Sequence, residues 1–160
     1  MHIDPLEKKW MYVIGFMTVI MVASMAYAAV MLNLHPPSNV ETIDPKTLHL
    51  SGEFVEDNLG TTTNPDGSIT VRMVAARYAF YPQMIEVPVD TPVTFRITSP
   101  DVLHGVHVPF TNMSTMVVPG YISEVNTTFR REGEAQFLCN EYCGMGHDYM
   151  WSKLKVVAKG

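Results

Sequence analysis

Twelve residues near the C-terminus concentrate side chains that bind metals. The segment 139–150 reads CNEYCGMGHDYM and contains two thiols, one imidazole and two thioethers. Sulfur and imidazole together are the ligands that favour copper over calcium, magnesium or manganese. His147 and Met150 follow Cys143 by four and seven residues. This density and spacing predict a metal site.

A second imidazole is available upstream of this segment. His104 ends the sequence DVLH and lies 35 positions before Cys139. A β-sandwich brings the ends of neighbouring strands together, so we expect His104 to reach the cysteine-rich segment. Gly144 and Gly146 have no Cβ, which lets the chain turn sharply and gather several ligands around one point.

Two cysteines are also compatible with simpler structures. They allow one disulfide, two buried thiols, or half of a zinc site. The imidazole of His147 and the thioether of Met150 next to them favour the metal site over these alternatives.

The elements that position these residues are expected to be strands. Short β-branched runs occupy residues 69–74, 84–89, 93–98 and 154–157. Prolines and the pair Pro119-Gly120 separate the runs. Turn signals spaced by about 8–12 residues predict a mainly β fold, a small antiparallel sandwich or barrel.

An apolar segment precedes this domain. Residues 10–32 carry no charge over 23 positions. As a helix they span roughly 34 Å, enough to cross a hydrocarbon core of about 30 Å. Lys8 and Lys9 lie just before the segment, so the positive-inside rule places the N-terminus in the cytoplasm.

A cleaved signal peptide is the alternative for the same segment. Residues 11–23 resemble its apolar core, and Ala26-Tyr27-Ala28 resembles its cleavage site. Because the chain in hand retains these residues, we expect a transmembrane anchor.

Charge divides the rest of the chain unevenly. The formal net charge is −5, and residues 41–66 account for it with six acids against one lysine. Residues 67–160 hold eight acids and eight bases. Such a balance without basic clusters excludes nucleic acid as a partner.

The apolar segment, the acidic stretch and the strand-like runs divide the chain. We expect four parts: a cytoplasmic N-terminus (1–9), a transmembrane helix (10–34), an acidic connector (35–66) and the metal-binding domain (67–160).

The motif C-x-E-x-C-G-x-x-H-x-x-M, with D-V-x-H upstream and P-G between, resembles the CuA domain of cytochrome c oxidase subunit II. The resemblance covers residues 69–157. It implies a cupredoxin-like Greek-key fold that holds two copper ions bridged by both thiolates. The implied ligands are His104, Cys139, Cys143, His147, Met150 and the backbone carbonyl of Glu141.

The same resemblance implies a function and partners. The domain would accept electrons from a cytochrome c and pass them to a heme-bearing subunit I, which reduces oxygen. The single anchor is similar to that of B-type heme-copper oxidases, with the copper domain on the periplasmic or extracellular side of the cell membrane, and membrane lipid around the helix.

Three further residues acquire roles from the resemblance. Tyr78 matches the aromatic position at which electrons enter, although it is equally compatible with simple packing. Glu7 is a candidate for the mouth of a proton path, against the alternative of a solvated charge. The carboxylate of Glu141 is a candidate ligand for magnesium or manganese at the boundary with subunit I.

Other copper proteins remain alternatives. A membrane-anchored mononuclear blue-copper carrier needs two histidines, one cysteine and one methionine, and leaves a cysteine unused. A copper-delivery protein binds reversibly through exposed sulfur ligands. The subunit II of a quinol oxidase shares the fold but lacks the copper ligands.

Overall fold

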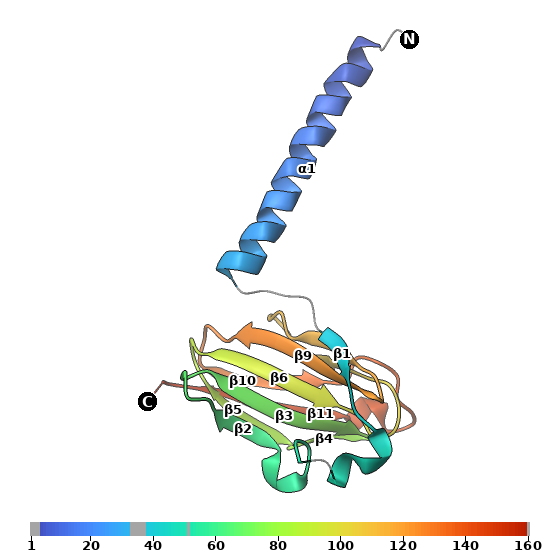
Figure 1. The fold of residues 1–160 in the computed structure, drawn as a ribbon, viewed down its shortest axis with the longest axis vertical. Helices are drawn as coiled ribbons and strands as arrows, with labels where there is room; N and C mark the ends of the chain where they lie inside the picture. Colours follow the sequence, from blue (N-terminus) through green and yellow to red (C-terminus); the bar gives the residue numbers. More distant parts are fainter. Residues whose placement is uncertain (1–3, 33–37, 51, 160) are drawn as a thin grey trace. The chain divides into compact units, whose positions relative to one another are not determined.

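The computed structural model describes residues 4–32, 38–50 and 52–159. The chain divides into two compact units, Met1–Leu34 and His35–Gly160 (Figure 1). The first unit contains one α-helix, and the second contains the strands and the metal-ligand candidates.

Helix α1 spans Pro5–Met31. Asp4 caps it by accepting a hydrogen bond of 2.7 Å from the Leu6 amide, and Pro5 fits the first turn because its missing N–H is not needed there. These signals start the helix five residues before the predicted start at residue 10, whereas predicted residues 33 and 34 lie outside the described part. Within that part, α1 alone is long and apolar enough to span a membrane.

Two sheets form the second unit (Figure 1). The first has the order β1-β9-β6-β3-β2, with β4 paired to β3, and the second has the order β5-β11-β10-β7-β8. The strands of the first sheet are β1 (Ser38–Thr42), β2 (Gly60–Thr63), β3 (Ile69–Ala76), β4 (Ala79–Tyr81), β6 (Pro92–Thr98) and β9 (Tyr121–Thr128). Those of the second are β5 (Met84–Pro88), β7 (His104–His107), β8 (Ser114–Val117), β10 (Gly133–Leu138) and β11 (Trp151–Val157). Three 3-10 helices, η1 (Pro45–Leu50), η2 (Glu56–Asn58) and η3 (His147–Tyr149), lie between strands.

The core lies between the two sheets and follows the period-2 pattern of the strands. Every second residue of β3 is buried, beginning with Ile69, as expected for a strand with one face toward a core. Phe95 of β6 packs edge-on against Phe137 of β10, with ring centroids 5.4 Å apart. This contact joins the two sheets, and the prediction of a mainly β sandwich is confirmed. The expectation of a purely antiparallel one is wrong, because β3 pairs with β6 and β5 with β11 in parallel.

The second unit begins earlier than the boundary predicted at residue 67. Strands β1 and β2 come from the expected connector and pair with β9 and β3. Leu48 and Phe54 from the same region are buried in a small cluster with Ile122 of β9. Acidic composition suggested a solvated linker, but these apolar residues anchor the segment to the first sheet.

Arg96 of β6 compensates the acidic charge of this segment. Its guanidinium contacts Glu124 of β9 at 2.9 Å, Glu41 at 2.8 Å and Glu53 at 3.0 Å. Hydrogen bonds to Glu53 raise the pKa of Arg96 against the opposing effect of its burial, so the guanidinium stays charged. One cation thus connects two strands and the segment that precedes β2.

We expect Arg96→Gln to lower the melting temperature of the chain by about 4–8 °C. This corresponds to about 2 kcal/mol, between the values for exposed and fully buried ion pairs, because the variant leaves three carboxylates without their shared cation. Thermal unfolding followed by circular dichroism measures the change. Arg130→Gln is the matched control, since its ion pair with Asp90 is exposed. Equal melting temperatures for the two variants would contradict the role of Arg96.

Candidate metal centre

The predicted ligand segment is the connection of a β-hairpin. Cys139 follows β10 directly, and Met150 directly precedes β11. The two strands pair from Gly133↔Val156 to Leu138↔Trp151. The Cys139 amide then donates a 3.1 Å hydrogen bond to the Met150 carbonyl. The ladder therefore holds both ends of the ligand loop, residues 139–150, side by side.

A single helical turn orients the last two candidate ligands. The His147 amide donates to the Gly144 carbonyl at 3.1 Å, and the Met150 amide donates to the His147 carbonyl at 3.1 Å. Gly144 has φ +131°, a conformation that side chains rarely allow. Because His147 and Met150 are three residues apart, this turn places both on the same side of it. The sequence does not predict the turn, since one turn is too short to show helical periodicity.

His104 reaches the ligand loop from β7, the neighbour of β10 in the same sheet. It begins β7, whose last residue, His107, pairs with Leu138 at the end of β10. The ring of His104 is fully buried. Its Nε2 hydrogen-bonds to Asp101 Oδ1 at 2.9 Å, which leaves Nδ1 facing Cys139. Asp101 was not among the predicted site residues, although its place three residues before His104 was visible in the sequence.

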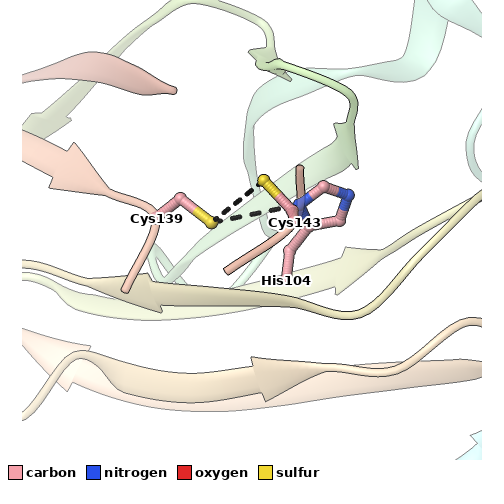
Figure 2. Close-up of side chains that lie close together, drawn as sticks. All are labelled: His104, Cys139 and Cys143. Carbon is pink, nitrogen blue, oxygen red and sulfur yellow. Dashed lines mark hydrogen bonds between the residues drawn. The ribbon is translucent and has the colours of Figure 1, made fainter. Parts of the chain in front are cut away.

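The two cysteine sulfurs lie close to each other and to the ring of His104 (Figure 2). Cys139 Sγ and Cys143 Sγ are 4.0 Å apart, and both cysteines are free. Cys139 Sγ lies 3.9 Å from His104 Nδ1 and 3.2 Å from the Glu141 carbonyl oxygen. These two thiols and the His104 ring offer ligand atoms that all lie within 4.8 Å of one another.

The remaining two donors gather around the other sulfur. Cys143 Sγ lies 3.7 Å from His147 Nδ1 and 3.6 Å from Met150 Sδ. Each sulfur thus has one imidazole nitrogen and one weaker donor beside it. The structure brings together all six predicted ligand groups.

The two thiols differ in acidity. Burial raises the pKa of Cys139, but hydrogen bonding with His104 and with the backbone amides of Gly105 and Glu141 outweighs burial and lowers it. Burial, and then the negative charge of Cys139, raises the pKa of Cys143. The proton of Cys143 is thus the more tightly held of the two, and a cation that binds both sulfurs as thiolates must displace it.

This donor set fits copper. Thiolate, thioether and imidazole are soft or intermediate ligands, and the sulfurs of both cysteines are buried from water. A structural zinc site takes four cysteine or histidine ligands, whereas here a thioether and a carbonyl oxygen also point at the sulfurs.

Tyr78 lies against the ligand loop, between strands β3 and β4. A Cβ added to Gly144 would lie 2.6 Å from the Tyr78 hydroxyl oxygen, and one added to Gly146 would lie 2.5 Å from the ring. The Tyr78 side chain is also 38% exposed. It therefore bridges the loop and the protein surface. Glu7 is an exposed residue in the first turn of α1, and Glu141 is half-buried within the loop.

Comparisons with known proteins agree with this site. The family described as "Cytochrome C oxidase subunit II, periplasmic domain" matches residues 70–157. Cytochrome c oxidase subunit 2 of Thermus thermophilus is 36% identical over 152 residues, covering 94% of this chain and 90% of that protein. A second Thermus thermophilus protein of that name is 38% identical over 121 residues, covering 76% of this chain and 90% of that protein.

Solved structures share the fold. A chain of a heme-copper terminal oxidase dimer superposes with a TM-score of 0.73 at 26% identity, covering 95% of this chain and 99% of that chain. The periplasmic domain of subunit II of cytochrome oxidase from Bradyrhizobium japonicum gives a TM-score of 0.52 at 19% identity, covering 56% of this chain and 83% of that chain. The second likeness shows the fold alone.

The likeness to the heme-copper oxidase chain confirms the cupredoxin-like fold expected from the sequence. One apolar N-terminal helix joined to this domain fits a single-pass membrane subunit. Membership of the matched family also implies that the chain binds copper and has other oxidase subunits as partners. The chain belongs to the cytochrome c oxidase subunit II family and is part of an oxidoreductase complex.

Proposed function

We propose that this chain transfers electrons through a dinuclear copper centre, CuA, in which Cys139 and Cys143 bridge two copper ions. It accepts electrons from a cytochrome c and passes them to the heme-bearing subunit I, where oxygen is reduced. One observation carries the proposal: the donors divide into two similar sets around two sulfurs that lie 4.0 Å apart.

The chain's own residues hold the site rigid and dry. When bound, a copper pair that shares one electron over two thiolates exchanges electrons with little change in its bonds. The β10–β11 ladder fixes the ends of the ligand loop, and the buried ring of His104 closes the site from the second sheet. Six protein groups would hold the metal and would leave no position for a substrate, unlike a catalytic metal site.

The alternative copper proteins fit less well. A mononuclear blue-copper site would leave one cysteine without a role, yet each cysteine lies beside an imidazole of its own, Cys139 beside His104 and Cys143 beside His147. A copper-delivery protein would expose its sulfur ligands, whereas Cys139 is 9% exposed and Cys143 6% exposed.

The surface around the ligand loop supports an apolar contact with cytochrome c. Tyr142, Met145 and Tyr149 of the loop are strongly exposed, and Tyr78 lies beside them against Gly144. Residues 67–160 are neutral in total, so they lack the large field of one sign that steers charged partners. We place the site at which electrons enter at Tyr78.

The membrane unit completes the proposal. Helix α1 crosses the cell membrane among its lipids with the N-terminus in the cytoplasm, and the copper domain lies on the periplasmic or extracellular side. The role of Glu7 at a proton path stays a prediction. Its position in the first turn of α1 places it near the cytoplasmic surface in this orientation.

Glu141 contributes two groups in this proposal. Its carbonyl oxygen points at Cys139 Sγ and serves as a copper ligand. That leaves its carboxylate for a magnesium or manganese ion at the boundary with subunit I, because hard cations prefer carboxylate oxygen.

We expect Cys143→Ser to abolish the delocalised mixed-valence signal in electron paramagnetic resonance spectra. One bridging thiolate cannot hold two coppers equivalently, so the copper content per chain should also fall. Met145→Leu is the matched control, because Met145 belongs to the same loop but is 92% exposed. An unchanged spectrum in Cys143→Ser, or a disulfide between the cysteines of the copper-loaded wild type, would refute the dinuclear site.

We expect cytochrome c oxidation by the assembled oxidase to fall by less than about threefold as salt rises from low to physiological strength.

We expect Tyr78→Ala to slow reduction of the copper centre by about five- to tenfold, since the substitution removes a central aromatic contact. Stopped-flow kinetics measures both effects. Tyr81→Ala is the control, because Tyr81 is also exposed but lines an apolar cavity with Leu48 and Phe54. A steep loss of rate with salt would contradict an apolar contact surface.

We expect Glu141→Gln to separate the two roles of this residue. The backbone carbonyl is unchanged, so copper content and the copper spectrum should stay as in the wild type. Magnesium or manganese in the assembled complex should fall, which elemental analysis measures. Loss of copper in the variant would contradict a purely backbone copper ligand, and absence of magnesium and manganese from the wild type would remove the second role.

A further inference from the structure

We propose that Asp101 is a positioning residue that ties the ligand His104 to the turn carrying Tyr78, so that one carboxylate aligns both the buried ligand and the aromatic side chain over the ligand loop. The inference rests on the proposed copper site and adds a residue to it.

The two carboxylate oxygens of Asp101 serve different elements. Oδ1 accepts a hydrogen bond from His104 Nε2 at 2.9 Å, at the start of β7. Oδ2 accepts one from the Arg77 amide at 2.8 Å, in the turn between β3 and β4. Arg77 and His104, which are 27 positions apart, are thereby joined through the side chain of Asp101.

The carboxylate is itself held in place. Oδ1 also accepts hydrogen bonds from the Val102 amide at 2.6 Å and from the Ser99 hydroxyl at 3.1 Å. A fixed carboxylate selects one orientation of the His104 ring, because the nitrogen that it binds cannot face the sulfurs. Nδ1 is then the nitrogen presented to Cys139 at 3.9 Å.

The Arg77 amide transmits the same constraint to Tyr78. The ring of Tyr78 packs over Gly144 and Gly146, where an added Cβ would collide with it. The two glycines flank Met145, and Gly146 immediately precedes the ligand His147. The ring therefore limits the movement of this part of the loop, and the Arg77–Asp101 hydrogen bond limits the movement of the ring.

A comparison with Asp66 shows that the position of a carboxylate's hydrogen-bond partners decides which elements it can join. It also accepts hydrogen bonds from a backbone amide and a serine hydroxyl, but both belong to Ser68, two residues away. Its role is confined to one turn. Asp101 combines such local bonds with two distant partners that both lead to the ligand loop.

The test compares Asp101→Asn and Asp101→Ala with the matched control Asp66→Asn in the full chain, kept in detergent micelles. The first measurement uses the metal-free protein: nuclear Overhauser contacts between the Tyr78 ring and the α-protons of Gly144 and Gly146. The second uses the copper-loaded protein: the rate at which a chelator removes copper.

We expect the Tyr78–glycine contacts to weaken in Asp101→Asn and to vanish in Asp101→Ala, while Asp66→Asn keeps them. Copper release should accelerate by about 10–100-fold in Asp101→Ala and by less in Asp101→Asn, which retains one acceptor oxygen. If Asp101→Ala does not fold, the isosteric Asp101→Asn carries the comparison.

Contacts and release rates in Asp101→Asn equal to those of Asp66→Asn would overturn the inference. The metal-free measurement separates it from the proposed function. A wild-type chain that binds no copper would refute the copper centre, whereas the Tyr78–glycine contacts would still respond to Asp101.

Discussion

The hydrogen bond between the Cys139 amide and the Met150 carbonyl is the constraint on which the site depends. It continues the β10–β11 ladder by one step and closes the twelve-residue ligand loop. With its ends fixed, the loop needs only one helical turn and one glycine of positive φ to aim four side chains inward. Because the loop is already ordered, metal binding carries a smaller entropic cost for ordering the ligands.

The sandwich supplies what the loop cannot. The ring of His104 comes from β7, and the apolar core beneath the sulfurs comes from both sheets. The acidic charge of the chain lies elsewhere, on the segment that Arg96 binds to the first sheet. The net negative charge is therefore concentrated in residues 41–66, whereas the ligand loop exposes Tyr142, Met145 and Tyr149 beside a single exposed carboxylate, Asp148. In the proposed function, such a surface suits brief contact with a redox partner without strong electrostatic attraction.

Sequence patterns were enough to predict the fold class and to select the ligand candidates, but not to predict each strand around them. Cys143, His147 and Met150 stand at a spacing that carries chemical meaning by itself, and the alternation of β3 is plain. The role of Asp101 depends on the Arg77 amide, which only the folded turn brings near. The four predicted runs correspond to β3, β5, β6 and β11, and the other described strands lie outside them. In β1 and β2, acidic and threonine-rich residues hide the pairing, and η3 could not be predicted because a single turn has no period. Helix α1 was recognised from its apolar length, but its start required attention to Asp4 and Pro5.

The two candidate histidine ligands come from different elements, and this affects the order in which the site forms during folding. Cys139, Cys143, His147 and Met150 belong to one hairpin, whose contacts are local and form early in folding. His104 arrives only when β7 pairs with β10, through the single register position Leu138↔His107. A nascent hairpin therefore presents an incomplete donor set, and the last nitrogen joins it only after β7 has paired with β10 within the second sheet. Complete coordination in the proposed centre would thus report that this sheet has formed around the hairpin, which makes the chain's own topology a checkpoint on metal loading.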